Sequence, residues 1–423
     1  MNRVFIEPIA RVEGHGGIEV LIEKNKVKDV KVDIFEGPRL IEKLVVGKTP
    51  DDAVSISSRI CAICFVSHRL SEIISHEKAL GINAGRKTRL LRKLAHYGEI
   101  IESHALHYFL LALPDYFGFP DAVSMLEKFE EVSAGLELKK FGNRVMEIVA
   151  GRRIHGENMR IGGFGRYPDV KDLEWIKAKS YELIPAIEKG LKLWEKINVP
   201  DYLEEQAVFM SVESTDEYSF DGDLVKVSTG EVFHGKEYLE FIKERVVPHS
   251  FSKRCRYKGK SYTVGALARV INSGELLDGM AGEYLRKFYS SRWLRNPLYN
   301  NIAQAIELLY CLEKIPALVD EILTADDRDF KPGGKNGYGV GVVEAPRGLL
   351  IHANRVVNGK VEHADYIIPT TQNLDDMEKY MRIAAENLLK RGEESLELPL
   401  EMIVRAYDPC ISCSVHLVRV VRR

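Results

Sequence analysis

Four of the six cysteines in this 423-residue chain form two C-x-x-C pairs. Cys61 and Cys64 lie in the segment RICAICFVSH, and Cys410 and Cys413 lie in DPCISCSVH. A C-x-x-C pair can chelate one ion from a single turn, and thiolates select zinc, iron, nickel or copper over magnesium and calcium. Six cysteines are too few for a disulfide framework in a chain of this length. The two pairs therefore predict a metal-binding or redox-active centre.

A structural zinc site with four cysteines is the plainest alternative. Cys64 and Cys410 are, however, 346 residues apart (410 minus 64), whereas the cysteine pairs of zinc sites usually lie much closer together. Each pair also has a histidine nearby, His68 and His416, and a charged neighbour such as Asp408 in the second motif. Polar residues of this kind favour a reactive centre over a purely structural one.

The elements that must position these residues are mostly helical. Apolar residues at helical spacing over 87–111 predict a long buried helix that ends at Pro114. Period-2 alternation predicts strands over 1–35 around a turn at Asn25, and hairpin-like turns predict short strands over 202–263. Further helices are expected at 53–80, 122–150, 170–195 and 296–325, a strand pair near 339–362 with its turn at Asn358-Gly359, and a loop at 333–341. This order predicts an α+β fold dominated by helices, with a long central helix bundle and small peripheral β-sheets.

The composition is that of a folded globular protein, with 45% hydrophobic and 29% charged residues. The chain has 60 Lys and Arg against 62 Asp and Glu, and this balance gives no reason to expect nucleic acid as a partner. No run of about 18 uncharged apolar residues predicts a transmembrane segment. Charged residues interrupt the first 13 positions, so we expect no secretory leader and a cytoplasmic location.

Five motifs together make the sequence resemble a known family over essentially its whole length. They are RVEGH at 11–15, RICAICFVSH at 59–68, SHALH at 103–107, EAPRG at 344–348 and DPCISCSVH at 408–416. The sequence resembles the large, catalytic subunit of a [NiFe]-hydrogenase, and is most similar to the cytosolic enzymes linked to pyridine nucleotides, including the archaeal sulfhydrogenases. The resemblance implies reversible oxidation of hydrogen, H₂ ⇌ 2H⁺ + 2e⁻, by heterolytic cleavage at a nickel–iron centre.

The resemblance also assigns the metal ligands. Cys61, Cys64, Cys410 and Cys413 would bind nickel, and Cys64 and Cys413 would also bridge to iron. The iron would carry carbon monoxide and cyanide ligands, so the protein would supply hydrogen-bond donors and a dry pocket around it.

Several residues would surround the iron and its ligands in this family. Arg347, which follows Pro346, matches the arginine above the metals, where its charge and N–H donors suit a cyanide and a polarised hydrogen molecule. Thr370 matches the hydroxyl that binds the second cyanide, and His68 matches the histidine that bonds a bridging cysteine sulfur. We place Asp408, in the second cysteine motif, among the catalytic groups. Taken alone, Arg347 is better explained as an ordinary turn arginine after Pro346.

Two carboxylates complete the expected site. Glu13 matches the glutamate that exchanges protons with the terminal cysteine Cys413, and a carboxylate near the metal is a suitable base for this step. Glu42 matches a ligand of a structural magnesium ion, with His416 as its imidazole ligand and a backbone carbonyl near Tyr366 as a third contact. Without the resemblance, Glu13 reads as a surface charge and Glu42 as part of an exposed helix face.

The SHALH motif departs from the respiratory members of the family. Many of those members have an aspartate directly before the H-x-x-H pair, where this chain has Ser103, so the role of that carboxylate is absent or moved. His104 and His107 share one helix face and can equally be hydrogen-bonded core histidines.

Processing at the C-terminal motif is a second expectation. Family members are cut after the last motif histidine, so we expect a single domain over 1–416 and removal of 417–423 by a maturation endopeptidase. The removed segment carries three arginines, which would change the formal charge from −2 to −5 (−2 minus 3).

The remaining sequence predicts that electrons leave this chain for partner subunits. Only Cys255 and Cys311 remain outside the two pairs, too few for an iron–sulfur cluster, and no G-x-G-x-x-G motif in a strand–helix context indicates dinucleotide or flavin binding. We expect a partner small subunit with iron–sulfur clusters and further subunits with iron–sulfur clusters and FAD or NAD(P) sites. NADP is the expected acceptor, and NAD, a deazaflavin and polysulfide stay open. A metal-free subunit of a related redox complex is the other alternative, but such relatives lack one or both cysteine pairs.

Overall fold

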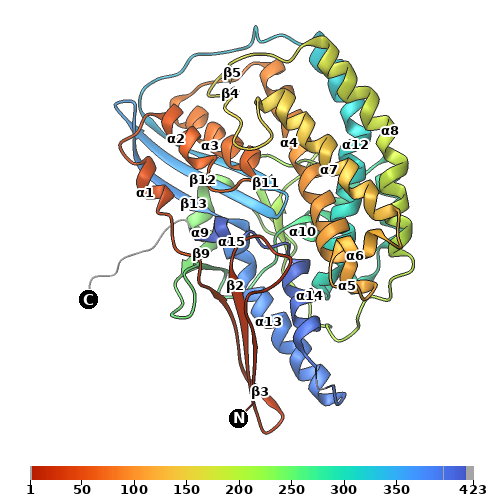
Figure 1. The fold of residues 1–423 in the computed structure, drawn as a ribbon. Coiled ribbons are helices and arrows are strands. Elements are labelled where there is room, and N and C mark those ends of the chain that lie inside the picture. The colour runs from red at the N-terminus through yellow and green to blue at the C-terminus, as the bar shows by residue number, and fades with distance from the viewer. Residues whose placement is uncertain (1, 394, 416–423) are drawn as a thin grey trace, which may run out of the picture.

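Four long helices pack together along one side of the molecule in the computed structural model, which describes residues 2–393 and 395–415 (Figure 1). They are α4 (Arg86–Ala105), α7 (Glu131–Ala150), α8 (Val170–Trp194) and α12 (Asn300–Thr324), packed against one another. In α8 the buried positions recur every three or four residues, as at Leu173, Ile176, Leu183 and Ile187, so one face enters the core. The predicted helix-dominated α+β class is confirmed.

The helix predicted over 87–111 does not end at Pro114. After α4 the chain continues as a π-helix over Leu106–Ala112 and then as α5 (Leu113–Tyr116). Pro114 lies in the first turn of α5, where a missing N–H costs no helical hydrogen bond. Because the π-helix is followed directly by a new α-helical turn that contains Pro114, the helical segment continues past the proline. The prediction that the helix ends at Pro114 is therefore wrong.

The single helix predicted over 53–80 is two helices, α2 (Pro50–Ser57) and α3 (Phe65–Leu80). The hydroxyl groups of Ser57 and Ser58 donate to the carbonyls of Val54 and Ser55 at 3.3 and 2.9 Å. Such side-chain bonds compete with the backbone ladder, and the helix stops there. The loop over 58–64 that follows contains the first cysteine pair.

A three-stranded antiparallel sheet supports α3 from beneath (Figure 1). Its strands are β11 (Gly337–Ala345), β12 (Gly348–Val357) and β13 (Lys360–Ile367), and the predicted Asn358-Gly359 turn joins the last two. A Cβ atom on Gly339 or Gly341 would lie 2.1 or 1.9 Å from a carbonyl oxygen of α3, so glycine permits this close packing. The prediction of a loop over 333–341 is therefore wrong for 337–341, which is strand.

The other predicted strands are present. The N-terminal strands β1 (Asn2–Ile6), β2 (Gly16–Glu23) and β3 (Lys26–Ile34) form an antiparallel sheet that turns at Asn25 and packs on α13 (Pro369–Lys390). Residues 202–263 hold β6 (Met210–Val212), β7 (Leu224–Val227), β8 (Val232–His234), β9 (Ile242–Arg245) and β10 (Arg254–Tyr257). Apart from short 3-10 helices, the remaining elements are β4 (Met159–Arg160), β5 (Gly163–Phe164), α1 (Ile41–Val45), α6 (Ala122–Leu126), α9 (Tyr238–Phe241), α10 (Ala266–Ser273), α11 (Gly279–Phe288), α14 (Glu397–Ala406) and α15 (Ile411–Ser414).

Three groups of buried apolar residues make up the core. The largest fills the helix bundle and the N-terminal sheet, and the second lies around β6–β10 and the β11–β13 sheet. The third is small and contains all four motif cysteines, with Ile60, Leu350 and Ile368 among its members. Among the described residues, none of the helices has both the length and the apolar character needed to cross a bilayer.

Candidate metal centre

Both cysteine pairs lie at the start of a helix. Cys64 directly precedes α3 and Cys410 directly precedes α15, while Cys61 belongs to the loop before α3 and Cys413 to α15 itself. The positive end of the 16-residue α3 favours negative charge on the neighbouring sulfur atoms. Local structure therefore presents each pair as a chelating turn.

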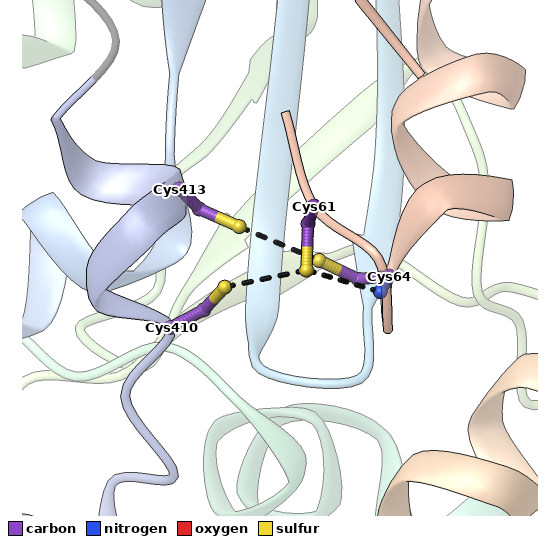
Figure 2. Close-up of side chains that lie close together, drawn as sticks. All are labelled: Cys61, Cys64, Cys410 and Cys413. Atoms are coloured by element: carbon purple, nitrogen blue, oxygen red, sulfur yellow. Dashed lines mark hydrogen bonds between the residues drawn. The ribbon is translucent and has the colours of Figure 1, made fainter. Parts of the chain in front are cut away.

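The fold brings the two pairs together, as Figure 2 shows. The Sγ atoms of Cys61 and Cys410 are 3.4 Å apart, those of Cys64 and Cys413 are 3.5 Å apart, and all four lie within 4.8 Å of one another. Metal–sulfur bonds of about 2.3 Å would bring the sulfurs to within about 4.6 Å of one another, close to the spacing in the structure, so the four thiolates suit one metal site. None of the four cysteines forms a disulfide, and each is at most 3% exposed.

Without a metal, the four thiols are not all ionised at neutral pH. Hydrogen bonds from the other thiols, that of Cys410 first, lower the pKa of Cys61 well below its usual value, and the charge of Arg347 adds to this effect. Burial, in contrast, raises the pKa of Cys410 and of Cys413 well above the usual value. A bound cation is what can hold all four as thiolates at neutral pH.

Arg347 lies beside the cysteines, in the turn between β11 and β12. Its Nε donates to Oδ1 of Asp408 at 3.1 Å, and Gln304 donates to the other oxygen of that carboxylate at 3.0 Å. Burial acts to lower the pKa of Arg347, but Asp408 and the cysteines raise it well above its usual value. The guanidinium is 3% exposed, and within the described part of the chain its Nη1 has no hydrogen-bond partner. An N–H donor is therefore available next to the sulfur atoms.

A second buried arginine holds the turn that carries Arg347. Arg269 donates to both oxygens of Glu307 at 2.6 Å and to Glu344 at 2.8 Å. The same guanidinium donates to the backbone carbonyls of Ala345 and Pro346 at 3.0 and 3.3 Å. Pro346 is thus fixed through its backbone, and the ion-pair cluster determines where the next residue points.

Thr370 and Glu13 both contact the second cysteine motif. The Thr370 hydroxyl, in the first turn of α13, accepts a hydrogen bond from the backbone N–H of Cys410 at 2.9 Å. The backbone carbonyl of Glu13 accepts from Ile411 at 3.0 Å, and its carboxylate accepts from the N–H of Ser412 at 3.1 Å. Glu13 is half-buried, and its carboxylate contacts Ser412, the residue directly before Cys413, so it does not lie on the open surface.

Two of the three residues predicted for the magnesium site are adjacent. Glu42, on α1, is 2% exposed, so it does not lie on an exposed helix face, and its Oε1 accepts the backbone N–H of Tyr366 at 2.8 Å. The contact shown is thus with the N–H of Tyr366, while the predicted ligand is a nearby carbonyl. The third residue, His416, lies outside the described residues.

Arg39 connects the loops of both cysteine motifs. Its Nη2 donates to the carbonyl of Ile60 at 2.6 Å and also to the carbonyl of Ser412. Its backbone N–H donates to the carbonyl of Val415 at 2.9 Å. One side chain from the segment before α1 therefore fixes two loops that are far apart in sequence.

The histidines of the RICAICFVSH and SHALH motifs are buried, whereas His15 of RVEGH is exposed. His104 lies 2.8 Å from a carboxylate oxygen of Glu307, and His107 lies 2.6 Å from the backbone carbonyl of Arg405, so both are hydrogen-bonded in the core. Nδ1 of His68, on α3, lies 3.1 Å from Nε2 of His352 on β12. A bond from His68 to a cysteine sulfur stays a prediction.

Comparison with known families decides the assignment. A family described as nickel-dependent hydrogenase matches residues 39–131 and 217–416, and a HoxL-like family matches residues 3–36. The chain belongs to the nickel-dependent hydrogenase family. The matched residues of this hydrogenase include both C-x-x-C pairs, Arg347 and Thr370.

Individual relatives extend the likeness over nearly the whole hydrogenase chain. Sulfhydrogenase 1 subunit alpha of Pyrococcus furiosus is 42% identical over 98% of both chains, and Sulfhydrogenase 2 subunit alpha of the same organism is 43% identical over 98% of this chain and 99% of its own. The solved structure of an NAD⁺-reducing [NiFe]-hydrogenase in the H₂-reduced state superposes with a TM-score of 0.90 at 29% identity, covering 98% of this chain and 100% of that one. The [NiFeSe]-hydrogenase from D. vulgaris Hildenborough, at 22% identity and a TM-score of 0.78, shares the fold over 98% of this chain.

The sequence thus locates the cysteines of this hydrogenase and the residues beside them, but not the groups that support them. The supporting residues come from distant segments and carry no motif of their own, so no signal in a single sequence identifies them. They are Arg39, Glu72, Arg269, Gln304, Glu307 and His352.

Proposed function

We propose that this hydrogenase subunit catalyses H₂ ⇌ 2H⁺ + 2e⁻ at a nickel–iron centre held by Cys61, Cys64, Cys410 and Cys413. The observation that carries the proposal is the convergence of four buried sulfurs within 4.8 Å. The donor set fits, because thiolates select soft or borderline metals. Cys64 and Cys413 are the pair proposed to bridge to iron, and their 3.5 Å separation suits two sulfurs that share two metals.

Carbon monoxide and cyanide on the iron would be bound by Arg347 and Thr370. The unpaired Nη1 of Arg347 supports this role, because a buried N–H without an acceptor is costly unless a ligand accepts from it. Thr370 uses its oxygen to accept from the Cys410 backbone, which leaves its own O–H proton to donate. Pro346 forms the apolar part of the same turn, and Asp408 fixes the orientation of Arg347.

Glu13 would move the proton. The nickel–iron centre, when bound, would supply the chemistry that splits hydrogen into two protons and two electrons. The Cys413 thiolate takes the proton at Sγ and the Glu13 carboxylate receives it from there, as general acid–base catalysis requires of a nearby carboxylate. The backbone bonds from Ile411 and Ser412 support this role, because they hold Glu13 against the cysteine turn.

A structural magnesium ion is proposed at Glu42, His416 and a backbone carbonyl near Tyr366. The carboxylate oxygens of Glu42 are the kind of ligand that magnesium prefers, and their burial would be stabilised by a cation. Metal analysis that finds no magnesium in the purified protein would contradict this site.

Partner subunits would carry the electrons onward. The relatives are named as subunits, among them the beta subunit of the NAD-reducing hydrogenase HoxS of Cupriavidus necator, 30% identical over 98% of this chain. We propose an iron–sulfur small subunit as the direct partner, further subunits with iron–sulfur clusters and FAD or NAD(P) sites, and NADP as the acceptor. The single domain over 1–416, removal of 417–423 by an endopeptidase and a cytoplasmic location stay predictions.

Metal content and hydrogen uptake of the purified complex test the central proposal. We expect nickel and iron in about 1:1 ratio with hydrogen uptake, both lost in Cys64→Ser because a bridging thiolate is removed. Cys255→Ser is the matched control, since Cys255 is also fully buried but lies beside Thr371, away from the cluster. Zinc in place of nickel, or uptake that survives in Cys64→Ser, would contradict the proposal.

A further inference from the structure

Glu72 is a fully buried carboxylate on α3 that binds side chains of two other elements. Its Oε2 lies 2.7 Å from Nδ1 of His352 on β12, and its Oε1 accepts the hydroxyl of Tyr366 on β13 at 3.0 Å. Oε1 also lies 3.1 Å from Nε2 of His76, one turn further along α3. Three donors thus converge on one carboxylate in a part of the core that water does not reach.

The position of the protons follows from this arrangement. The two oxygens of Glu72 face two imidazoles and one hydroxyl within hydrogen-bond distance, an arrangement that suits an ionised carboxylate. An ionised carboxylate only accepts hydrogen bonds, so Nδ1 of His352 must carry the proton that it donates. The other ring nitrogen, Nε2, then faces His68.

His68 is the partner of that second nitrogen. Its Nδ1 lies 3.1 Å from His352 Nε2, and the two ring centroids are 5.3 Å apart. His68 is 1% exposed and lies one helical turn after Cys64, whose carbonyl accepts its backbone N–H at 3.2 Å. Glu72 therefore acts through His352 on the position of the His68 imidazole, which lies one helical turn after Cys64.

We propose that Glu72 is a positioning residue for the metal centre: through His352 it fixes the ring orientation of His68, the residue predicted to bond a bridging cysteine sulfur. The proposal rests on the nickel–iron centre proposed above. Carboxylates that orient a histidine near a metal commonly affect metal affinity or activity by about 10- to 100-fold.

The π-stacked contact of His352 with Tyr366 strengthens the case for a fixed ring. The two ring centroids are 3.9 Å apart with an interplanar angle of 18°, so His352 cannot rotate without displacing the tyrosine. The hydroxyl of the same tyrosine donates to Glu72. One carboxylate and one aromatic ring thus restrain His352 from two sides.

Glu72→Gln tests the proposal, because glutamine keeps the size of the side chain and removes its charge. An amide offers only one acceptor oxygen, so its NH₂ group must face a donor, and the proton arrangement of His352 and His68 has to change. We expect nickel and iron to be retained and hydrogen uptake to fall about 10- to 100-fold. Ser75→Ala is the matched control: Ser75 contacts Asn354 and Gly339 at the same helix–sheet interface.

The readout is the infrared bands of the carbon monoxide and cyanide ligands and the nickel electron paramagnetic resonance of the purified complex. We expect Glu72→Gln to shift these signals and Ser75→Ala to leave them at their wild-type positions. Tyr366→Phe, which removes one donor to Glu72 and keeps the stacked ring, should give a smaller shift in the same direction.

Three results would overturn the proposal: unchanged signals in Glu72→Gln, an equal shift in Ser75→Ala, or, where Glu72→Gln does not fold, unchanged signals in Tyr366→Phe. A wild-type complex without nickel, iron or these bands would instead overturn the proposed centre itself. The two failures are therefore distinguishable.

Discussion

Replacing Arg269 with glutamine would leave two buried carboxylates without their cation. Arg269 is 2% exposed, and its three bonds to Glu307 and Glu344 measure 2.6, 2.6 and 2.8 Å. Both carboxylates are fully buried, so water cannot replace the lost partner. The substitution also removes the bonds that hold the backbone of the turn leading to Arg347.

The expected loss of stability follows from Glu307. Burial acts to raise the pKa of this carboxyl, but Arg269 first and then His104 lower it to about 2 from an ordinary value of 4.5. That difference corresponds to about 3 kcal/mol of stability at neutral pH. Breaking a buried ion pair by removing one partner costs about 3–5 kcal/mol, so two separate arguments agree.

The sign of the pH dependence follows from the same values. In the wild type the folded pKa of Glu307 is below the unfolded one, so its contribution is complete above about 4.5 and disappears as the pH falls toward 2. Without Arg269 the folded pKa of Glu307 is expected to rise, because burial is then opposed only by weaker partners such as His104 and the Tyr218 hydroxyl. The stability difference between the variant and the wild type should therefore grow with rising pH.

Urea unfolding of the large subunit, followed by circular dichroism at pH 5 and at pH 7 in buffers of the same ionic strength, measures both the loss of stability and its pH dependence. Arg86→Gln is the control, because Arg86 forms an exposed ion pair with Glu321 that should be worth less than about 1 kcal/mol. A loss in Arg269→Gln no larger than that of Arg86→Gln would refute the reasoning. So would a stability difference from the wild type that does not grow between pH 5 and pH 7.

Two further predictions concern the catalytic proton and the support of the metal site. Glu13→Gln should retain nickel and iron but lose about 100-fold or more of hydrogen uptake, because an amide cannot accept the proton; unchanged uptake would remove Glu13 from the proton route. Gly341→Ala should destabilise the protein by about 1–3 kcal/mol, since its new Cβ would lie 1.9 Å from the carbonyl oxygen of Ser71, and thermal unfolding measures this cost. Gly163→Ala, where nothing lies within 4 Å of the added atom, is the comparison, and an equal effect of both would contradict the packing argument.

Local patterns in the sequence were sufficient wherever one element decides its own conformation. The alternation over 1–35 gives the N-terminal strands, and the long apolar stripe of 170–195 gives α8, since neither needs a distant partner. The strand at 337–341 is different. In the sequence its glycines are typical of a loop. Only the structure shows that α3 packs so closely on this strand that a side chain larger than hydrogen would clash.

The candidate site divides in the same way. Cysteine motifs carry their chemistry in their spacing, and resemblance supplies the roles of Glu13 and Arg347. Glu72 and His352 are 280 residues apart, and nothing in either segment indicates that the two side chains meet. Interactions between separate elements of this kind are set by tertiary packing, which a single sequence does not display.

The separation of the two cysteine pairs also has a thermodynamic consequence for the polypeptide. A metal bound by Cys64 and Cys410 closes a loop of 346 residues (410 minus 64). If the metal is treated as a cross-link, the lost conformational entropy of the unfolded chain corresponds to a stabilisation of the folded state by about 6 kcal/mol at 25 °C. A metal held there would therefore stabilise the fold as well as supply the chemistry: while it is bound, the residues between the two pairs, which include the helix bundle, cannot unfold into a fully open chain.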